Sequence, residues 1–140
     1  MDYLIEKGVK VDAIITDPPY AVTGYSWDQI IPFDKMWDKL LKLIKDDGAI
    51  VLFGNEPFSS NLRLSNNKLY RYDWKWLKTQ ITGFQNAKYQ PLRCYEDIMV
   101  FSKGGTVHQS LVHMKYYPQG TIAVNLKVTR TTVNYLSEKK

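Results

Sequence analysis

The tetrapeptide Asp17-Pro18-Pro19-Tyr20 carries the most specific chemistry in this sequence. Proline has a fixed φ and no N–H group, so two consecutive prolines present carbonyl oxygens with no neighbouring donors. The carboxylate of Asp17 adds further acceptors, and the ring of Tyr20 can stack on a flat ligand. We interpret the tetrapeptide as a platform that binds an exocyclic amine on a heteroaromatic ring.

The reaction that such a platform favours is transfer to the amine nitrogen. An amino group of adenine or cytosine is a poor nucleophile because its lone pair is delocalised into the ring. Two fixed acceptors favour a pyramidal nitrogen whose lone pair points at an electrophilic carbon, which is catalysis by orientation and electrostatic preorganisation. No covalent intermediate is needed. Cys94, His108 and His113 show no nucleophile–base pairing and no zinc-ligand spacing, so we expect no metal site.

The residues around the tetrapeptide predict a strand, a helix and a second strand. Val11–Thr16 is a short apolar run that ends at the prolines, as a buried strand would. Apolar residues at steps of three and four over 33–44 predict an amphipathic helix, which Asp47-Gly48 ends. Ala49–Phe53 is wholly apolar, like a strand covered on both faces. This parallel crossover places Asp17 at the carboxyl end of a strand, where open α/β sheets bind ligands.

The rest of the chain has weaker patterns. They predict a helix at 57–64, a strand at 70–77 and a long functional loop at 79–95. A second strand is predicted at 97–102, with a hairpin partner at 107–114, and a weakly alternating stretch follows at 121–136. Alternation in the first strand puts Trp74 and Trp76 on one side and Lys75 on the other. We interpret the tryptophans as a buried stripe rather than as a nucleic-acid face.

Composition and charge limit the class of protein. The chain has 140 residues, of which 44% are apolar and 14% aromatic, enough for one globular domain with a core. Its longest uninterrupted apolar run has five residues, so we expect no membrane span. The single cysteine cannot form a disulfide within the chain, which indicates a reducing compartment.

The charges are unevenly distributed along the chain. Up to Asn67 there are seven Lys and Arg against ten Asp and Glu, whereas from Lys68 onward there are twelve against four. A basic half within a domain this small is typical of proteins with a polyanionic partner. We therefore expect a nucleic acid, with ordinary solvated charges as the alternative.

These motifs resemble the DNA amino-methyltransferases, the adenine-N6 and cytosine-N4 enzymes that use S-adenosylmethionine (SAM). Their hallmark is [DNS]-P-P-[YFW] at the end of a strand, and the DPPY form is associated more often with adenine. The resemblance covers the chain from Val11 to about Gln119 and includes Trp27, the segment DDGAIVLFG and the segment WKWLKTQITGFQNAKYQPLRCYEDIMVFSKG. Several phage- and bacterium-encoded members, including enzymes of restriction–modification systems, look like this. The resemblance therefore implies a cytoplasmic protein of a bacterial or phage-infected cell.

The resemblance implies an α/β fold, a Rossmann-like class I methyltransferase sheet, in which the catalytic motif precedes the cofactor motif. In that group the methyl donor is held mainly by a C-terminal F-x-G-x-G element, and this sequence has no G-x-G after Gly83. We therefore expect residues 1–140 to form a single partial domain, the catalytic half with a C-terminal hairpin. On its own it would bind SAM weakly. A second polypeptide, or a second copy in a homodimer, would supply the cofactor half.

The resemblance also assigns roles to residues. Asp17 and the Pro18 carbonyl would hold the amino group of a flipped adenine, Pro19 would stiffen the turn, and Tyr20 would stack on the base. Tyr25 and Trp27 would form part of the wall of the base pocket; the alternative is that they only pack against neighbouring side chains. Residues 79–120 would contact double-stranded DNA and recognise the target. Contacts to the DNA backbone would come from four basic residues, Lys75, Lys88, Arg93 and Lys103.

Four alternatives remain open. The target could be the N4 amine of cytosine, an RNA base or a protein amide. The chain could also be a non-catalytic DNA-binding remnant of such an enzyme, in which case DNA binding would persist without binding of the methyl donor.

Overall fold

The computed structural model describes residues 1–23 and 25–123, which contain three α-helices and four strands. The helices are α1 (Asp2–Glu6), α2 (Phe33–Leu43) and α3 (Phe58–Ser65). The strands are β1 (Val11–Thr16), β2 (Ile44–Gly54), β3 (Tyr70–Thr82) and β4 (Arg93–Phe101), and a short 3-10 helix, Phe84–Asn86, follows β3. None of the described helices is long and apolar enough to cross a membrane.

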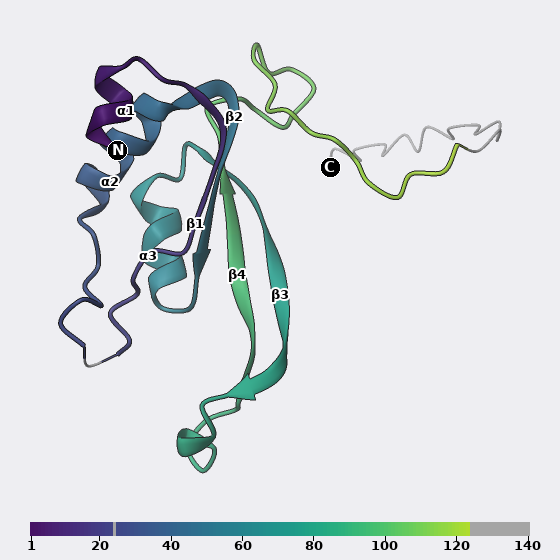
Figure 1. Ribbon diagram of the computed structural model, residues 1–140. Coiled ribbons are helices and arrows are strands. Elements are labelled where there is room, and N and C mark those ends of the chain that lie inside the picture. The colour runs from purple at the N-terminus through teal and green to yellow at the C-terminus, as the bar shows by residue number, and fades with distance from the viewer. Residues whose placement is uncertain (24, 124–140) are drawn as a thin grey trace, which may run out of the picture.

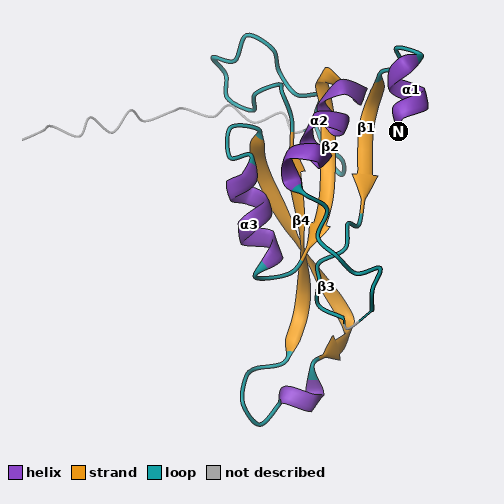
Figure 2. Ribbon diagram, turned by 90° about the vertical axis from the view of Figure 1, so that its left-hand side faces the viewer, coloured by secondary structure: helices purple, strands orange, loops and turns teal. Residues whose placement is uncertain are grey.

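The four strands form one mixed sheet in the order β1-β2-β4-β3. β1 pairs with β2 in parallel, and β4 runs antiparallel to both of its neighbours. The α-helices lie together on one side of this sheet (Figures 1 and 2). The predicted α/β class and the parallel strand–helix–strand unit are therefore confirmed, as a partial Rossmann-like sheet.

The core lies between α2, α3 and the sheet. Apolar residues of α2 recur on the face that meets the sheet, and Trp37 packs edge-on against Phe101 of β4 with ring centroids 4.9 Å apart. The indole N–H of Trp37 donates to Ser65 at 2.8 Å, which satisfies its polar atom inside the core. The buried cluster consists of ten apolar side chains: Met36, Trp37, Leu40, Ile44, Ile50, Leu52, Phe58, Leu62, Met99 and Phe101.

The boundary between α2 and β2 differs from the prediction. The helix ends at Leu43, and Ile44, expected in the helix, is already extended and pairs with Val11. The register between the strands then shifts, and Gly48 lies where the strands approach closely, because a Cβ there would come within 2.7 Å of the Asp12 carbonyl oxygen. Gly48 is thus required by the strand pairing and does not end the helix.

The prediction that Val11–Thr16 is a buried strand was wrong. β1 lies at an edge of the described sheet, with only Val11 and Ile14 half-buried, and Ile15 is 67% exposed. Apolar composition is the same for an edge strand and a central one, so it did not reveal the position. Likewise, only one face of β2 is fully buried, and Ala49, Val51 and Phe53 on its other face are partly exposed.

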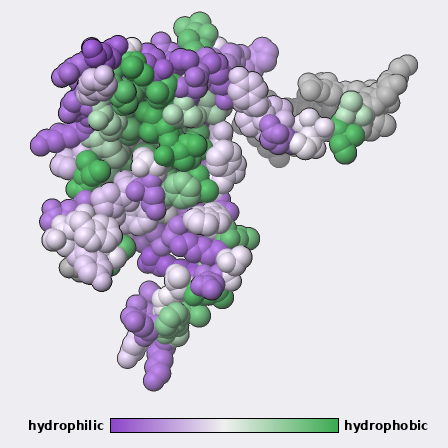
Figure 3. Space-filling view, in the orientation of Figure 1, coloured by the Kyte–Doolittle hydropathy of each residue, from purple (hydrophilic) through white to green (hydrophobic). Residues whose placement is uncertain are grey.

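The sheet face opposite the helices is only partly covered: residues 114–119 lie near Val51 and Val100, and Val100 is 1% exposed. Trp74 and Trp76 lie on this face and are each about half exposed, so the prediction that they form a buried stripe was wrong. We call this surface the open sheet face and define it by its apolar side chains that are exposed or half-buried: Ile15, Val51, Phe53, Tyr72, Trp74, Trp76 and Ile98. Figure 3, which views the sheet from the side of β1, shows hydrophobic side chains, in green, gathered where β1 and β2 lie.

Beyond the sheet, β3 and β4 continue as a two-stranded arm. β2 pairs with β4 as far as Gly54 and Asp97, and residues 76–96, which we call the arm, extend past that point (Figure 1). The predicted loop 79–95 is shorter than expected, because β3 runs to Thr82 and β4 begins at Arg93. Gly83, with a left-handed φ of 87°, turns the chain into the short 3-10 helix at the tip.

The predicted hairpin partner at 107–114 is not a strand. Both edges of β4 are occupied, by β2 and β3, so a following segment has no edge to pair with. The chain instead closes on itself through two hydrogen bonds, from Gly105 N to Val112 O at 2.8 Å and from Met114 N to Gly105 O at 3.0 Å. Of the predicted C-terminal stretch, residues 124–136 lie outside the described part of the chain.

Candidate active site

The tetrapeptide lies at the edge of the sheet where β1 and β2 both end. β1 and β2 are parallel, so their carboxyl ends meet at one edge, with Asp17 following β1 and Gly54 ending β2. β4 runs the opposite way and brings Asp97 beside Gly54. A carboxylate, the two prolines and the base of the arm therefore share one edge of the sheet.

A pocket of about 420 Å³ opens at this edge. Pro18 is buried and Pro19 and Tyr20 are half-buried, whereas the Asp17 side chain is exposed. All four predicted catalytic residues thus line one cavity, together with part of the loop that follows them; its walls are Asp17, Pro18, Pro19, Tyr20, Val22, Thr23, Trp27 and Asp28.

Tyr20 is held at both ends of its side chain. Its hydroxyl donates a hydrogen bond to the Asp17 carboxylate, and its ring packs against Phe58 of α3 with centroids 5.0 Å apart. Burial, and next the hydrogen bond to Asp17, raise the pKa of the Tyr20 hydroxyl well above its ordinary value. The tyrosine therefore stays a donor, and it orients the carboxylate beside the pocket.

The two aromatic residues predicted to wall the pocket lie together. Tyr25 and Trp27 stack with centroids 5.8 Å apart and an interplanar angle of 10°, and both rings are about two-thirds exposed. Trp27 lines the pocket, whereas Tyr25 is in contact with it only through Trp27.

Asp28 was missed by the sequence analysis. Its carboxylate is 6% exposed and accepts backbone N–H bonds from Ala21, Val22 and Thr23, and a fourth bond from the Thr23 hydroxyl. The two hydrogen bonds from Thr23, and then those from the other amides, lower the pKa of Asp28. The only available signal was an acidic residue a few positions beyond a proline-rich turn, which is too common to single out.

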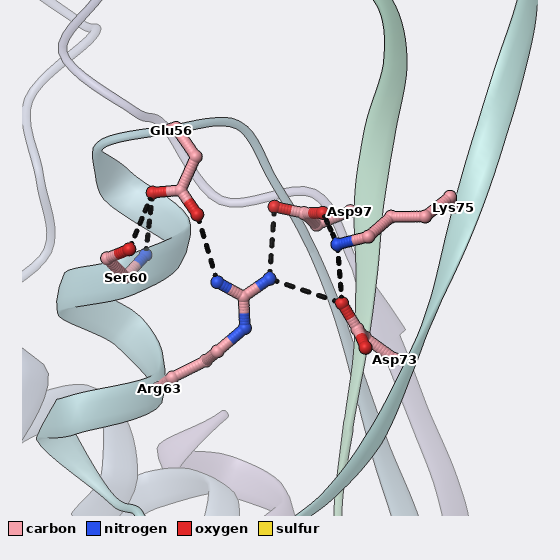
Figure 4. Close-up of polar contacts among 6 residues, drawn as sticks. All are labelled: Glu56, Ser60, Arg63, Asp73, Lys75 and Asp97. Carbon is pink, nitrogen blue, oxygen red and sulfur yellow. Dashed lines mark hydrogen bonds and ion pairs between the residues drawn. The ribbon is translucent and has the colours of Figure 1, made fainter.

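A charge network lies behind the pocket edge, at the base of the arm (Figure 4). Asp97 on β4 is 2% exposed and is approached by Arg63 of α3 at 3.1 Å and by Lys75 of β3. Burial would raise the pKa of Asp97, but Lys75 and Arg63 outweigh it and lower the pKa. Arg63 also pairs with Glu56 at 3.0 Å and with Asp73 at 3.2 Å, so one guanidinium ties α3 to both strands of the arm.

The four predicted DNA-contacting residues fall into two groups. Lys75 belongs to the charge network and Lys103 pairs with Asp46 at 3.0 Å, so both ammonium groups already face carboxylates. Lys88 and Arg93 are exposed on the arm, and neither forms an ion pair with any residue in the described ranges. Glu96 pairs with Lys78 across the arm.

Residues that could hold a metal or a methyl donor are not evident here. Within residues 1–23 and 25–123, no three His, Cys, Asp or Glu side chains gather into a potential metal site. The pocket walls offer acceptors for an amine, but they contain no glycine-rich turn that could take the ribose and methionine of SAM.

Comparison with known proteins supports the fold. The chain is similar to the crystal structure of the M1.HpyAVI–SAM complex, with a TM-score of 0.56 and 18% identity over 88% of this chain and 58% of that one. It is also similar to the crystal structure of M1.HpyAVI, with a TM-score of 0.54 and 20% identity over 73% of this chain and 50% of that one. The chain therefore spans between half and three-fifths of these structures. No family model and no curated protein sequence matches it.

Removal of the Arg63 guanidinium should destabilise the fold strongly. Arg63→Ala leaves Asp97 buried with one cationic partner fewer, which we expect to cost about 3–5 kcal/mol in the free energy of unfolding. The matched control is Lys42→Ala, which breaks the exposed pair with Asp38 on α2 and should cost less than about 1 kcal/mol. Urea denaturation measures both, and equal losses in the two variants would contradict a structural role for the network.

Proposed function

We propose that this chain is the catalytic half of a DNA adenine-N6 methyltransferase. The observation that carries the proposal is the Asp17-Pro18-Pro19-Tyr20 pocket at the carboxyl end of β1. The fold supports the proposal, because two solved structures of similar fold are those of M1.HpyAVI, a DNA methyltransferase, and one of them is a complex with SAM. A ligand site at strand carboxyl ends is also the general rule for open α/β sheets.

The pocket suits a flipped base that presents an amine. Asp17 is exposed to the cavity and is oriented by the Tyr20 hydroxyl, so it can accept an N–H from the amino group. Pro18 and Pro19 add rigid backbone without donors. Tyr20, braced by Phe58, provides a ring surface for the base, and a second aromatic wall comes from Trp27. These groups would fix the amine with its lone pair available for attack, which is the orientation that methylation requires.

Adenine is the proposed base because the tetrapeptide has the DPPY form. The N4 amine of cytosine offers the same donors to Asp17, and it is the second candidate. Amines of RNA bases or of protein amides could also be recognised by the same acceptors. The identity of the methylated product separates these alternatives.

Loss of the Asp17 carboxylate should abolish methylation. In an enzyme reconstituted with the polypeptide that carries the cofactor element, Asp17→Ala is expected to lower the rate by at least about a hundredfold, the usual scale for losing one preorganised polar group. Transfer of labelled methyl groups to double-stranded DNA, with analysis of the nucleosides, measures both rate and product. Asp34→Ala, on the exposed side of α2, is the control. Near-normal turnover by Asp17→Ala would overturn the assignment.

We propose that the arm contacts the DNA. It carries Lys88 and Arg93, which have no carboxylate partner among the described residues, and its exposed aromatic side chains include Phe84 and Tyr89. Cations interleaved with aromatic rings are typical of nucleic-acid surfaces, since phosphates attract the cations and bases stack on the rings. The arm also starts at the edge where the pocket opens, so DNA along it would reach Asp17.

Neutralising the arm should weaken DNA binding and its dependence on salt. The double variant Lys88→Gln, Arg93→Gln is expected to bind duplex DNA more weakly and to lower the slope of log K against log salt by nearly 2, about 0.9 for each lost phosphate contact. Fluorescence anisotropy at several salt concentrations measures this, with Lys35→Gln on α2 as the control. An unchanged slope would exclude the arm as the phosphate-contacting surface. DNA binding without methylation in any reconstituted enzyme would favour the non-catalytic alternative.

We further propose that the methyl donor is held mainly by a second polypeptide or chain segment that covers the open sheet face. A group of large apolar side chains exposed together on one sheet face is typical of a surface that another protein segment covers. Here Trp74, Trp76 and Ile15 are exposed on one face, and the matched structures are considerably longer than this chain. A homodimer is the alternative, in which a second copy of the chain covers the same face.

The isolated chain should bind SAM weakly. Calorimetric titration of SAM into the purified chain is expected to show no binding in the micromolar range, because the pocket provides no glycine-rich cradle. Micromolar affinity for SAM would refute the proposal that another polypeptide or segment mainly holds the methyl donor. Sedimentation of the same sample over a range of concentrations separates the two covering partners, since a homodimer would form without any addition.

A further inference from the structure

Four hydrogen bonds gather one short loop around a single carboxylate. Asp28 Oδ1 accepts from Ala21 N at 2.9 Å, and Oδ2 accepts from Val22 N at 2.8 Å and Thr23 N at 2.6 Å. The Thr23 hydroxyl adds a bond to Oδ2 at 2.8 Å. Successive backbone amides that converge on one anion form a nest, which is a specific anion-binding arrangement.

The backbone of this loop depends on the carboxylate. Ala21 has a φ of 55°, in the left-handed region that a residue with a Cβ seldom adopts without support. The amides of residues 21–23 follow directly after the tetrapeptide and take no part in the sheet, so they need other acceptors. Asp28 supplies one buried acceptor group for all three.

We call the four hydrogen bonds from residues 21–23 to Asp28 the clamp. The clamp connects two parts of the pocket wall. Ala21 follows Tyr20 directly, and Asp28 follows Trp27 directly. Val22, Thr23 and Asp28 itself line the cavity. Resting on the proposed function, we propose that Asp28 is a positioning residue: it holds Tyr20 and Trp27 across the base pocket before any ligand binds.

An amide in place of the carboxylate should not hold this arrangement. Asn has the same size but only one acceptor oxygen, and its NH₂ group would face backbone donors. Asp28→Asn is therefore expected to speed the hydrogen exchange of the amides of residues 21–23 by about tenfold or more, as the loop opens locally. The exchange of Leu52 and Met99, in the core strands, should not change. NMR of the ligand-free chain measures both sets.

A graded variant and an activity readout complete the test. Thr23→Val removes only the hydroxyl bond and should give a smaller acceleration, confined to the same amides. Asp34→Asn, an exposed carboxylate outside the site, is the matched control and should change neither set. In the reconstituted enzyme, Asp28→Asn should lower kcat/KM by at least about tenfold at unchanged unfolding midpoint, whereas a residue that only stabilises the fold would shift the midpoint.

The outcomes separate this inference from the proposed function. Unchanged hydrogen exchange at residues 21–23 in Asp28→Asn would overturn the proposed clamp. Equal acceleration of exchange throughout the core, or a variant that fails to fold, would also overturn it, because Asp28 would then support the whole domain. If the exchange result is as expected but no reconstituted enzyme methylates DNA, the clamp stands and the proposed function fails. If methylation occurs and Asp28→Asn leaves kcat/KM unchanged, the function stands and the positioning role fails.

Discussion

The buried carboxylate of Asp97 constrains the arrangement of this domain more than any other single group. A charge removed from water must be neutralised by nearby charge or hydrogen bonds. Here the partners come from different elements, Arg63 from the helix layer and Lys75 from β3. Satisfying one carboxylate therefore sets the helix layer, the central strand and the base of the arm relative to each other. Because Asp97 pairs with Gly54, it sets them relative to the pocket edge as well.

The charge distribution then divides the proposed work between two regions. The pocket edge is rich in carboxylates, with Asp17 and Asp28 in its wall, and in the proposed function it would repel phosphate while accepting a neutral base. Lys88 and Arg93 lie further out on the arm, where a phosphate backbone could rest without meeting those carboxylates. Within the described residues, the cations after Lys68 thus include Lys75 and Lys103, which pair with carboxylates, and Lys88 and Arg93, which form no ion pair there.

Local patterns predicted the parts of the structure that depend on local physics. The 3.6-residue period of α2 and the strand-ending prolines after β1 were both informative, since each reflects the geometry of a single element. The burial of β1, the exposure of Trp74 and the missing strand at 107–114 could not be predicted, because each depends on which strands are neighbours. Asp28 was invisible for the same kind of reason, as its partners are backbone amides, which every residue carries.

The open sheet face has a consequence for how this protein is synthesised. A chain leaving the ribosome with half-exposed tryptophans beside an unpaired strand edge has a surface that aggregates readily. In the proposed function, the segment that covers this face would bind soon after synthesis, either as residues made next or as a partner already present. The production of this domain and of whatever covers it would then be matched in time and in amount, and an excess of the domain alone would be cleared or lost to aggregates.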